Sequence, residues 1–118
     1  MDEIFNHSST TGLMLATLGG QPQVVTFALD ALAGRGETIR DVVVIHLDTG
    51  NPRTRASLAR LATEFAGDRY QGQVCRLRLA PVRLLDIRGE QEADIAWNTI
   101  HSLIGALKTQ ERPLHLCI

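Results

Sequence analysis

Residues 13–32 read LMLATLGGQPQVVTFALDAL, and this stretch decides the fold. The apolar run Leu13–Leu18 is typical of a strand that is covered on both faces. Gly19 and Gly20 follow it, and a glycine pair permits a sharp turn in which the main chain can approach a ligand closely. Pro22 suits the first turn of a helix, because its missing N–H is not needed there. The stretch therefore predicts a strand, a glycine turn and a helix over about 22–34.

Apolar residues recur at helical spacing through Val25, Leu29 and Leu32, which predicts that this helix packs on a sheet. Free N–H groups in the turn, together with the positive end of the helix, would provide a binding place for an anion or a phosphate. Many α/β domains begin with the same unit and bind nothing there. The spacing alone leaves both interpretations open.

The remaining chain alternates between apolar runs and helical patterns, which predicts the order β-α-β-α-β-α-β. The expected fold is α/β, a three-layer Rossmann-like parallel sheet with helices on both faces. Arg76 and Arg78 alternate with apolar residues and indicate a solvent-facing side or an edge strand. Residues 1–11, which include His7, are expected to be a flexible leader before one domain over 12–118. The expected elements are strands at 13–18, 41–48, 73–80 and 114–118 and helices at 22–34, 53–66 and 90–109.

Sheets of this class bind ligands at the carboxyl ends of their strands, in the loops that follow. The chain stops at Ile118, in or directly after the fourth expected strand. We therefore expect the domain to be incomplete there: either the sequence is a fragment, or a partner supplies the next loop.

The composition of the chain argues against several classes of function. The formal net charge of −1 argues against a broad basic surface for long nucleic acid, and 44% hydrophobic residues suffice for a core. No apolar run reaches membrane-spanning length, and the start of the chain lacks the basic residues of a signal peptide. Cys75 and Cys117 lie in apolar runs and are expected to be buried, reduced thiols. A cytoplasmic protein is the simplest expectation.

The ordered set of segments is similar to a known family. Ala16–Pro22 (ATLGGQP), a helix and then Val42–Leu47 (VVVIHL) resemble the CRISPR-associated Rossmann-fold (CARF) domains, and within them the ring nucleases of the NE0113-type family. The Leu85–Ile87 connector before an acidic helix start, and Arg112–Ile118 (RPLHLCI), add to the resemblance. It covers nearly the whole chain from about residue 12.

This resemblance implies a homodimer that binds cyclic oligoadenylate, the small cyclic RNA messenger of type III CRISPR defence, with cyclic tetra-adenylate as the first expectation. It also implies that the protein, in its complete form, is a ring nuclease that needs no metal or other cofactor. A ribose 2′-hydroxyl would attack the neighbouring phosphate and leave a 2′,3′-cyclic phosphate, which switches the antiviral response off. The protein would mainly align the reacting atoms and stabilise charge on the phosphate.

Relatives often carry Ser at the position of Gln21, and they continue past the fourth strand into a glycine-rich basic loop that faces the phosphates. Gln21 can hydrogen-bond a phosphate but cannot ionise; it is the one catalytic residue we predict. Thr17 either points its hydroxyl at the ligand or packs, and Asp48–Asn51 either contact the ligand or form a turn and a helix cap. The predicted ligand-binding residues are Thr17, Leu18, Gly19, Gly20, Gln21, Pro22, Asp48, Thr49, Gly50 and Asn51.

Other polar and aromatic residues favour structural interpretations. His46 lies within an apolar strand and is expected to be a core histidine rather than a base. Arg53 and Arg55 either meet phosphate or are solvated charges. Trp97 is expected to pack or to contact the dimer partner, and neither His101 nor His115 has neighbours at metal-ligand spacing. Asp86, Arg88 and Glu90 either line the rim of the site or form a capped helix start.

Two rival functions remain open. One is a non-catalytic sensor of cyclic oligoadenylate that controls an effector. The other is a PP-loop enzyme of the ATP-pyrophosphatase or sulfonucleotide reductase type, since Val44–Gly50 (VIHLDTG) is similar to the second strand of those proteins. Their loop needs serines and an aspartate, which Leu18–Gln23 (LGGQPQ) lacks.

Overall fold

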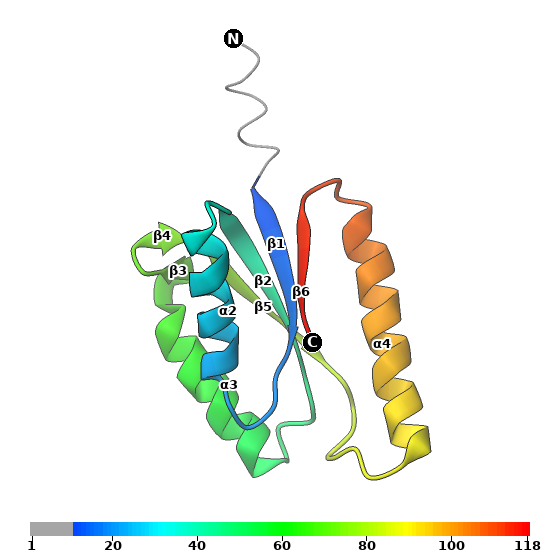
Figure 1. The fold of residues 1–118 in the computed structure, drawn as a ribbon. Helices are drawn as coiled ribbons and strands as arrows, with labels where there is room; N and C mark the ends of the chain where they lie inside the picture. Colours follow the sequence, from blue (N-terminus) through cyan, green and yellow to red (C-terminus); the bar gives the residue numbers. More distant parts are fainter. Residues whose placement is uncertain (1–10) are drawn as a thin grey trace.

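The computed structural model describes residues 11–118 and shows a sheet of four parallel strands (Figure 1). The strands are β1 (Gly12–Thr17), β2 (Ile39–His46), β5 (Arg76–Pro81) and β6 (Leu114–Cys117). Their order across the sheet is β5-β2-β1-β6, and each neighbouring pair is parallel. The leader predicted for residues 1–11, with His7, lies almost wholly outside the described residues.

Helices cover both faces of this sheet, as Figure 1 shows. The helices α2 (Gln23–Gly34) and α3 (Pro52–Glu64) pack on one face, and α4 (Glu90–Lys108) packs on the other. The predicted three-layer Rossmann-like α/β fold is confirmed. No helix within residues 11–118 is both long and apolar enough to cross a membrane.

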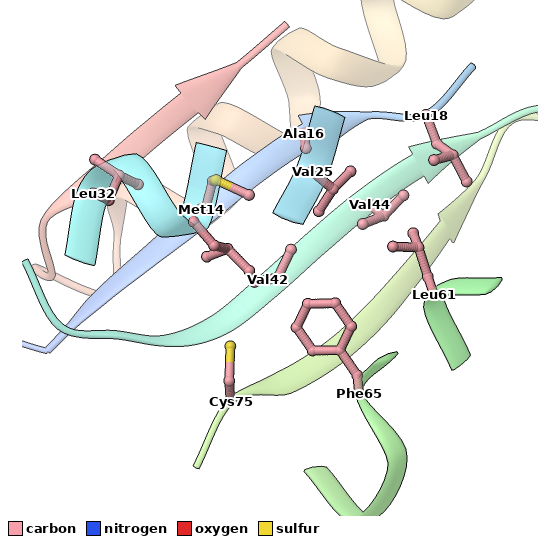
Figure 2. Packing of buried hydrophobic residues seen from close by; sticks show 11 residues of the cluster. Met14, Ala16, Leu18, Val25, Leu32, Val42, Val44, Leu61, Phe65 and Cys75 are labelled. Carbon is pink, nitrogen blue, oxygen red and sulfur yellow. The ribbon is translucent and has the colours of Figure 1, made fainter. Parts of the chain in front are cut away.

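Successive side chains of the two central strands, β1 and β2, point to opposite faces of the sheet and so form its interfaces with the helices on both sides. Met14 and Ala16 of β1, with Val42 and Val44 of β2, face α2 and α3 (Figure 2). The intervening residues of the same strands enter the cluster beneath α4. Each fully buried aliphatic side chain contributes roughly 1.5–3 kcal/mol of transfer free energy. Burial on both faces explains why these strands are continuous apolar runs. The residues facing α4 are Leu13, Leu15, Val43 and Ile45.

The helix boundaries follow local chemistry and lie within two residues of the predicted ones. Asn51 caps α3 by accepting hydrogen bonds from the N–H groups of Arg53 and Thr54, and Pro52 opens that helix. Pro22 stands at the start of α2, as its fixed φ predicts. The strands β1 and β2 each begin and end slightly earlier than predicted.

The strand predicted at 73–80 is wrong in one respect, because Cys75 interrupts it. After a 3-10 helix (Ala66–Asp68), β3 (Arg69–Tyr70) and β4 (Gln73–Val74) form a small antiparallel hairpin, and β5 begins only at Arg76. The turn between β3 and β4 has φ of 51° at Gln71 and 80° at Gly72, the left-handed conformation that tight hairpins need. Glutamine rarely adopts this conformation, so the hairpin could not be predicted from the residue types alone. The predicted edge position is confirmed for β5.

The connections between the strands distinguish one position at the carboxyl edge of the sheet. The crossovers from β1 to β2 and from β2 to β5 run over the face that carries α2 and α3, whereas the crossover from β5 to β6 runs over the α4 face. The direction of winding therefore reverses between β1 and β6. Open α/β sheets bind ligands outside the carboxyl ends of the strands at such a point. The loop Leu18–Pro22 leaves β1 at this position.

Candidate ligand-binding site

The loop after β1 is anchored at both sides but keeps its donors open. The N–H of Leu18 donates to the Ile45 carbonyl at 2.8 Å, and the Gly19 carbonyl accepts from Ser57 Oγ at 2.9 Å. Within residues 11–118, the N–H groups of Gly19, Gly20 and Gln21 donate to no protein acceptor. Exposed, successive N–H groups of this kind suit an anion.

The first turn of α2 adds to the positive character of this loop. No side chain caps the helix, and no acidic residue lies in its first turn. The positive end of the helix dipole is therefore not neutralised locally. The Gln23 side-chain amide donates to Gln21 Oε1, and the Gln21 NH2 group, the donating end of that side chain, has no acceptor among residues 11–118. Gln21 is thus placed to donate a hydrogen bond to a bound oxyanion.

Residues 48–51 form the loop after β2, beside the first loop. Asp48 Oδ1 accepts from the Gly50 N–H at 2.8 Å, and Asn51 Nδ2 donates to the Leu85 carbonyl at 2.8 Å. With its cap on α3, Asn51 uses both ends of its amide within the fold. The turn-and-cap interpretation is confirmed for Asp48 and Asn51. Ligand contact through Asp48–Asn51 stays a prediction, and Thr49 and Gly50 are exposed at this edge.

The connector after β5 completes the same edge. The Asp48 N–H donates to the Leu84 carbonyl at 2.8 Å, and a Cβ at Gly50 would lie 2.9 Å from Leu85 Cδ2. The three loops therefore lie in sequence along the carboxyl ends of β1, β2 and β5. Asp86 accepts from the Ile87 N–H at 2.8 Å and lies 3.4 Å from Arg88 Nε, a local contact. Gly89 stands at the N-cap of α4 and no side chain among residues 11–118 caps that helix, so the capped helix start predicted for Asp86, Arg88 and Glu90 is wrong.

Other residues singled out from the sequence lie outside these three loops. His46 is buried, and its Nδ1 donates to the Leu47 carbonyl at 2.7 Å, which confirms a core histidine. The rings of Trp97 and His101 lie in a tilted contact along α4, with centroids 4.6 Å apart and planes at 59°. His115 Nε2 lies 3.6 Å from Glu37 Oε1. Thr17 is half-buried at the end of β1. In the described part of the chain, no three side chains of metal-binding type form a group.

Ser57 is the contact that the sequence analysis missed. It is 3% exposed and lies on the buried stripe of α3, with Thr54 and Leu61. A hydroxyl at such a position normally has a partner, and this was the available signal. The partner itself, the carbonyl of Gly19, is 38 residues away and follows only from the fold.

The amino edge of the sheet carries a second polar cluster, remote from these loops. Asp41 pairs with Arg76, Arg78 and Arg112. Burial alone raises the pKa of the Asp41 carboxyl, but hydrogen bonds from Arg112 and Arg76 outweigh burial and hold that pKa below its ordinary value of 3.8. A cavity of about 390 Å³, lined by Asp30, Tyr70 and Cys75 among others, also opens toward the amino edge. Neither feature shares a residue with the candidate site.

The sheet order and the open turn at the winding reversal define a Rossmann-like α/β domain whose first loop leaves three main-chain N–H groups without a partner among residues 11–118. The family model of the CRISPR-associated protein NE0113 matches residues 21–118, and the chain belongs to that family. The protein is accordingly CRISPR-associated. A comparison with curated proteins found no significant match.

Proposed function

We propose that this protein is a CARF-type domain that binds cyclic oligoadenylate, with cyclic tetra-adenylate as the first candidate, and cleaves it as a metal-independent ring nuclease. The observation that carries the proposal is the open turn at Gly19, Gly20 and Gln21, at the carboxyl end of β1. Membership of the CRISPR-associated family supplies the biological setting. Cleavage would end type III CRISPR signalling.

The chemistry of the turn fits a phosphodiester. Three main-chain donors, the uncapped start of α2 and the Gln21 amide all favour a negatively charged oxygen at one place. A cyclic oligoadenylate presents one such phosphate for each nucleotide, so two copies of the turn can be occupied by one ring. This favours a two-fold symmetric complex.

Exposed apolar side chains support a homodimer at the same edge. Phe27 is 66% exposed near the start of α2, and Trp97 is 54% exposed in the first half of α4. Both helices begin at the carboxyl edge of the sheet, at the lower end of the molecule in Figure 1. A partner that covers this edge would bury these side chains and enclose the ligand. The exposed apolar residues of this region are Val24, Phe27, Leu85, Ile87, Ile95, Trp97, Leu116 and Ile118.

The proposed reaction is an in-line transesterification. The ribose O2′ forms a bond to phosphorus as the bond from phosphorus to the neighbouring O5′ breaks. The proton lost from the 2′-hydroxyl is balanced by a proton taken up by the leaving 5′-oxygen. The ring opens to a linear product with a 2′,3′-cyclic phosphate and a 5′-hydroxyl. The turn acts by holding the phosphate in line and stabilising its developing charge.

One observation favours the sensor as a second candidate. The loop Leu18–Pro22 contains no side chain that ionises near neutral pH, and Gln21 cannot relay a proton as a serine hydroxyl can. A domain that binds the ring and releases it intact would need nothing more than the geometry described above.

Incubation with radiolabelled cyclic tetra-adenylate in EDTA, with cyclic hexa-adenylate in parallel, tests the proposal. A mobility shift with a linear product ending in a 2′,3′-cyclic phosphate supports the ring nuclease. A shift with intact ligand supports the sensor. If neither cyclic tetra-adenylate nor cyclic hexa-adenylate is bound or cleaved, the ring nuclease and the sensor are both contradicted.

A further inference from the structure

The face of α3 that packs toward α2 also supports the glycine turn. Ser57 Oγ donates to the Gly19 carbonyl at 2.9 Å, and Arg53 Cδ lies 3.6 Å from the place that a Cβ on Gly20 would occupy. Arg53 and Ser57 are four residues apart, so they lie on the same side of the helix. Gly19 is therefore hydrogen-bonded to α3, and the side chain of Arg53 lies beside Gly20.

The contact with Ser57 fixes the direction of a donor. No peptide bond in the described chain is cis, so the Gly19 carbonyl and the Gly20 N–H point in opposite directions from a planar peptide. Because Ser57 holds the carbonyl toward α3, the Gly20 N–H is directed away from α3. Neither glycine has a Cβ to resist rotation of this peptide, so the hydroxyl is the restraint on its orientation.

The hydrogen bond from Ser57 to a carbonyl outside its own helix is unusual. A serine inside a helix usually bonds the carbonyl one turn earlier in the same helix. Here the hydroxyl leaves the helix to meet another loop, and it does so from a buried position. A buried hydrogen bond of this kind is costly to break.

Arg53 is the better placed of the two arginines at the start of α3. The Arg55 guanidinium donates to the Thr49 carbonyl at 3.1 Å, whereas the exposed Arg53 side chain has no ion-pair or hydrogen-bond partner among residues 11–118. Its main-chain N–H donates to the capping Asn51, which fixes the base of the side chain beside Gly20. A free guanidinium next to open N–H groups suits a phosphate oxygen.

We infer that Ser57 is a positioning residue that orients the Gly20 N–H, and that Arg53 supplies the cation that meets the phosphate held by this turn. The inference rests on the proposed function and adds to it the α3 half of the phosphate-binding site. The two sides of the site then have distinct roles. The glycine turn supplies main-chain donors, and α3 supplies the charge of the exposed Arg53 side chain.

Three variants test it: Ser57→Ala, Arg53→Gln and, as the charge-matched control, Arg60→Gln. Arg60 is an exposed arginine two turns further along α3, where it pairs with Glu64 at 3.9 Å. We expect Ser57→Ala and Arg53→Gln each to weaken cyclic tetra-adenylate binding by about tenfold, and Arg60→Gln to change it less than twofold. Arg53→Gln alone should flatten the salt dependence of binding. Equal losses in Arg53→Gln and Arg60→Gln would overturn the role of Arg53.

The Gly20 amide provides a readout that does not depend on the messenger. In 15N-labelled protein, titration with inorganic phosphate should shift the Gly20 amide resonance, and this shift should be lost in Ser57→Ala and Arg53→Gln. Ser57→Thr keeps the hydroxyl and should retain it. If the wild-type resonance responds to phosphate while cyclic oligoadenylate does not bind, the proposed ligand is wrong and the phosphate site stands. An unchanged Gly20 resonance in free Ser57→Ala overturns the positioning role.

Discussion

Arg112 Nη2 lies 2.8 Å from Asp41 Oδ2, and this ion pair joins the segment that leads into β6 to the start of β2 across the intervening strand β1. The same guanidinium donates to the carbonyls of Thr11 and Gly12, where β1 begins. Asp41 is 3% exposed and also accepts from Arg76 at 2.9 Å, on β5. One buried carboxylate and two arginines thus connect all four strands at the amino edge.

The first prediction concerns the stability of this connection. Replacing Arg112 by alanine leaves the buried Asp41 carboxylate without its shortest ion pair and two carbonyls without their donor. Breaking a buried pair in this way typically costs about 3–5 kcal/mol, and Arg76 offsets only part of that. Urea unfolding should show the loss as a lower midpoint. Arg88→Ala, at a largely exposed arginine, is the control and should cost less than about 0.5 kcal/mol.

The second prediction is a loss of stability in acid. The pKa of Asp41 in the folded protein lies below 3.8, so the folded state binds this proton less readily than the unfolded chain does. The stabilisation is therefore fully present above the unfolded pKa and is lost as the pH falls through the folded pKa. Urea midpoints should fall from about pH 5 downward. Asp41→Asn should be less stable than wild type at pH 7, and the difference should shrink toward pH 3; a constant difference would contradict this origin.

The layers of the fold could be predicted from the sequence, whereas the contacts between distant loops could not. The runs in β1 and β2 are apolar because both faces are buried, and that pattern is local enough to be seen without a structure. The hairpin at Gln71 depends on one unusual backbone conformation, which composition does not reveal. For the site, the glycine turn was visible in the sequence. Its support by Ser57 was not, because a contact over 38 residues requires the sheet order first.

The third prediction separates the two cysteines. Burial raises the pKa of the Cys75 thiol to about 11, with the Asp41 charge as a further cause. Cys75 is free and 3% exposed, whereas Cys117 is free and only half-buried. The thiolate is the reactive form, so Cys117 should react first. With a disulfide reagent at pH 8, native protein should label at Cys117 and not at Cys75, and urea should equalise the two rates. Equal rates in native protein would contradict the burial of Cys75.

The fourth prediction tests the proposed dimer surface. Phe27→Glu places a charge on the exposed apolar surface beside the candidate site, and it should convert a dimer into monomers in sedimentation experiments. Val74→Glu is the control, because Val74 is also exposed, at 40%, but lies on the β3–β4 hairpin away from the carboxyl edge. That variant should remain dimeric. Wild-type protein that sediments as a monomer even with cyclic tetra-adenylate bound would exclude the two-fold complex.

The last prediction concerns Gln21, whose side-chain oxygen accepts a hydrogen bond from Gln23 and whose NH2 group has no acceptor in the described part of the chain. Gln21→Ala removes one donor to the phosphate and should weaken cyclic tetra-adenylate binding by about tenfold or less, since the main-chain donors remain. Gln21→Ser shortens the side chain but supplies a hydroxyl, the group that similar ring nucleases carry there. We expect this variant to cleave faster than wild type in single-turnover assays with EDTA, even if its affinity falls. Faster cleavage by Gln21→Ser and slower cleavage by Gln21→Ala would show that this position acts on the reacting phosphate. Equal cleavage rates in all three proteins would remove Gln21 from the catalytic role.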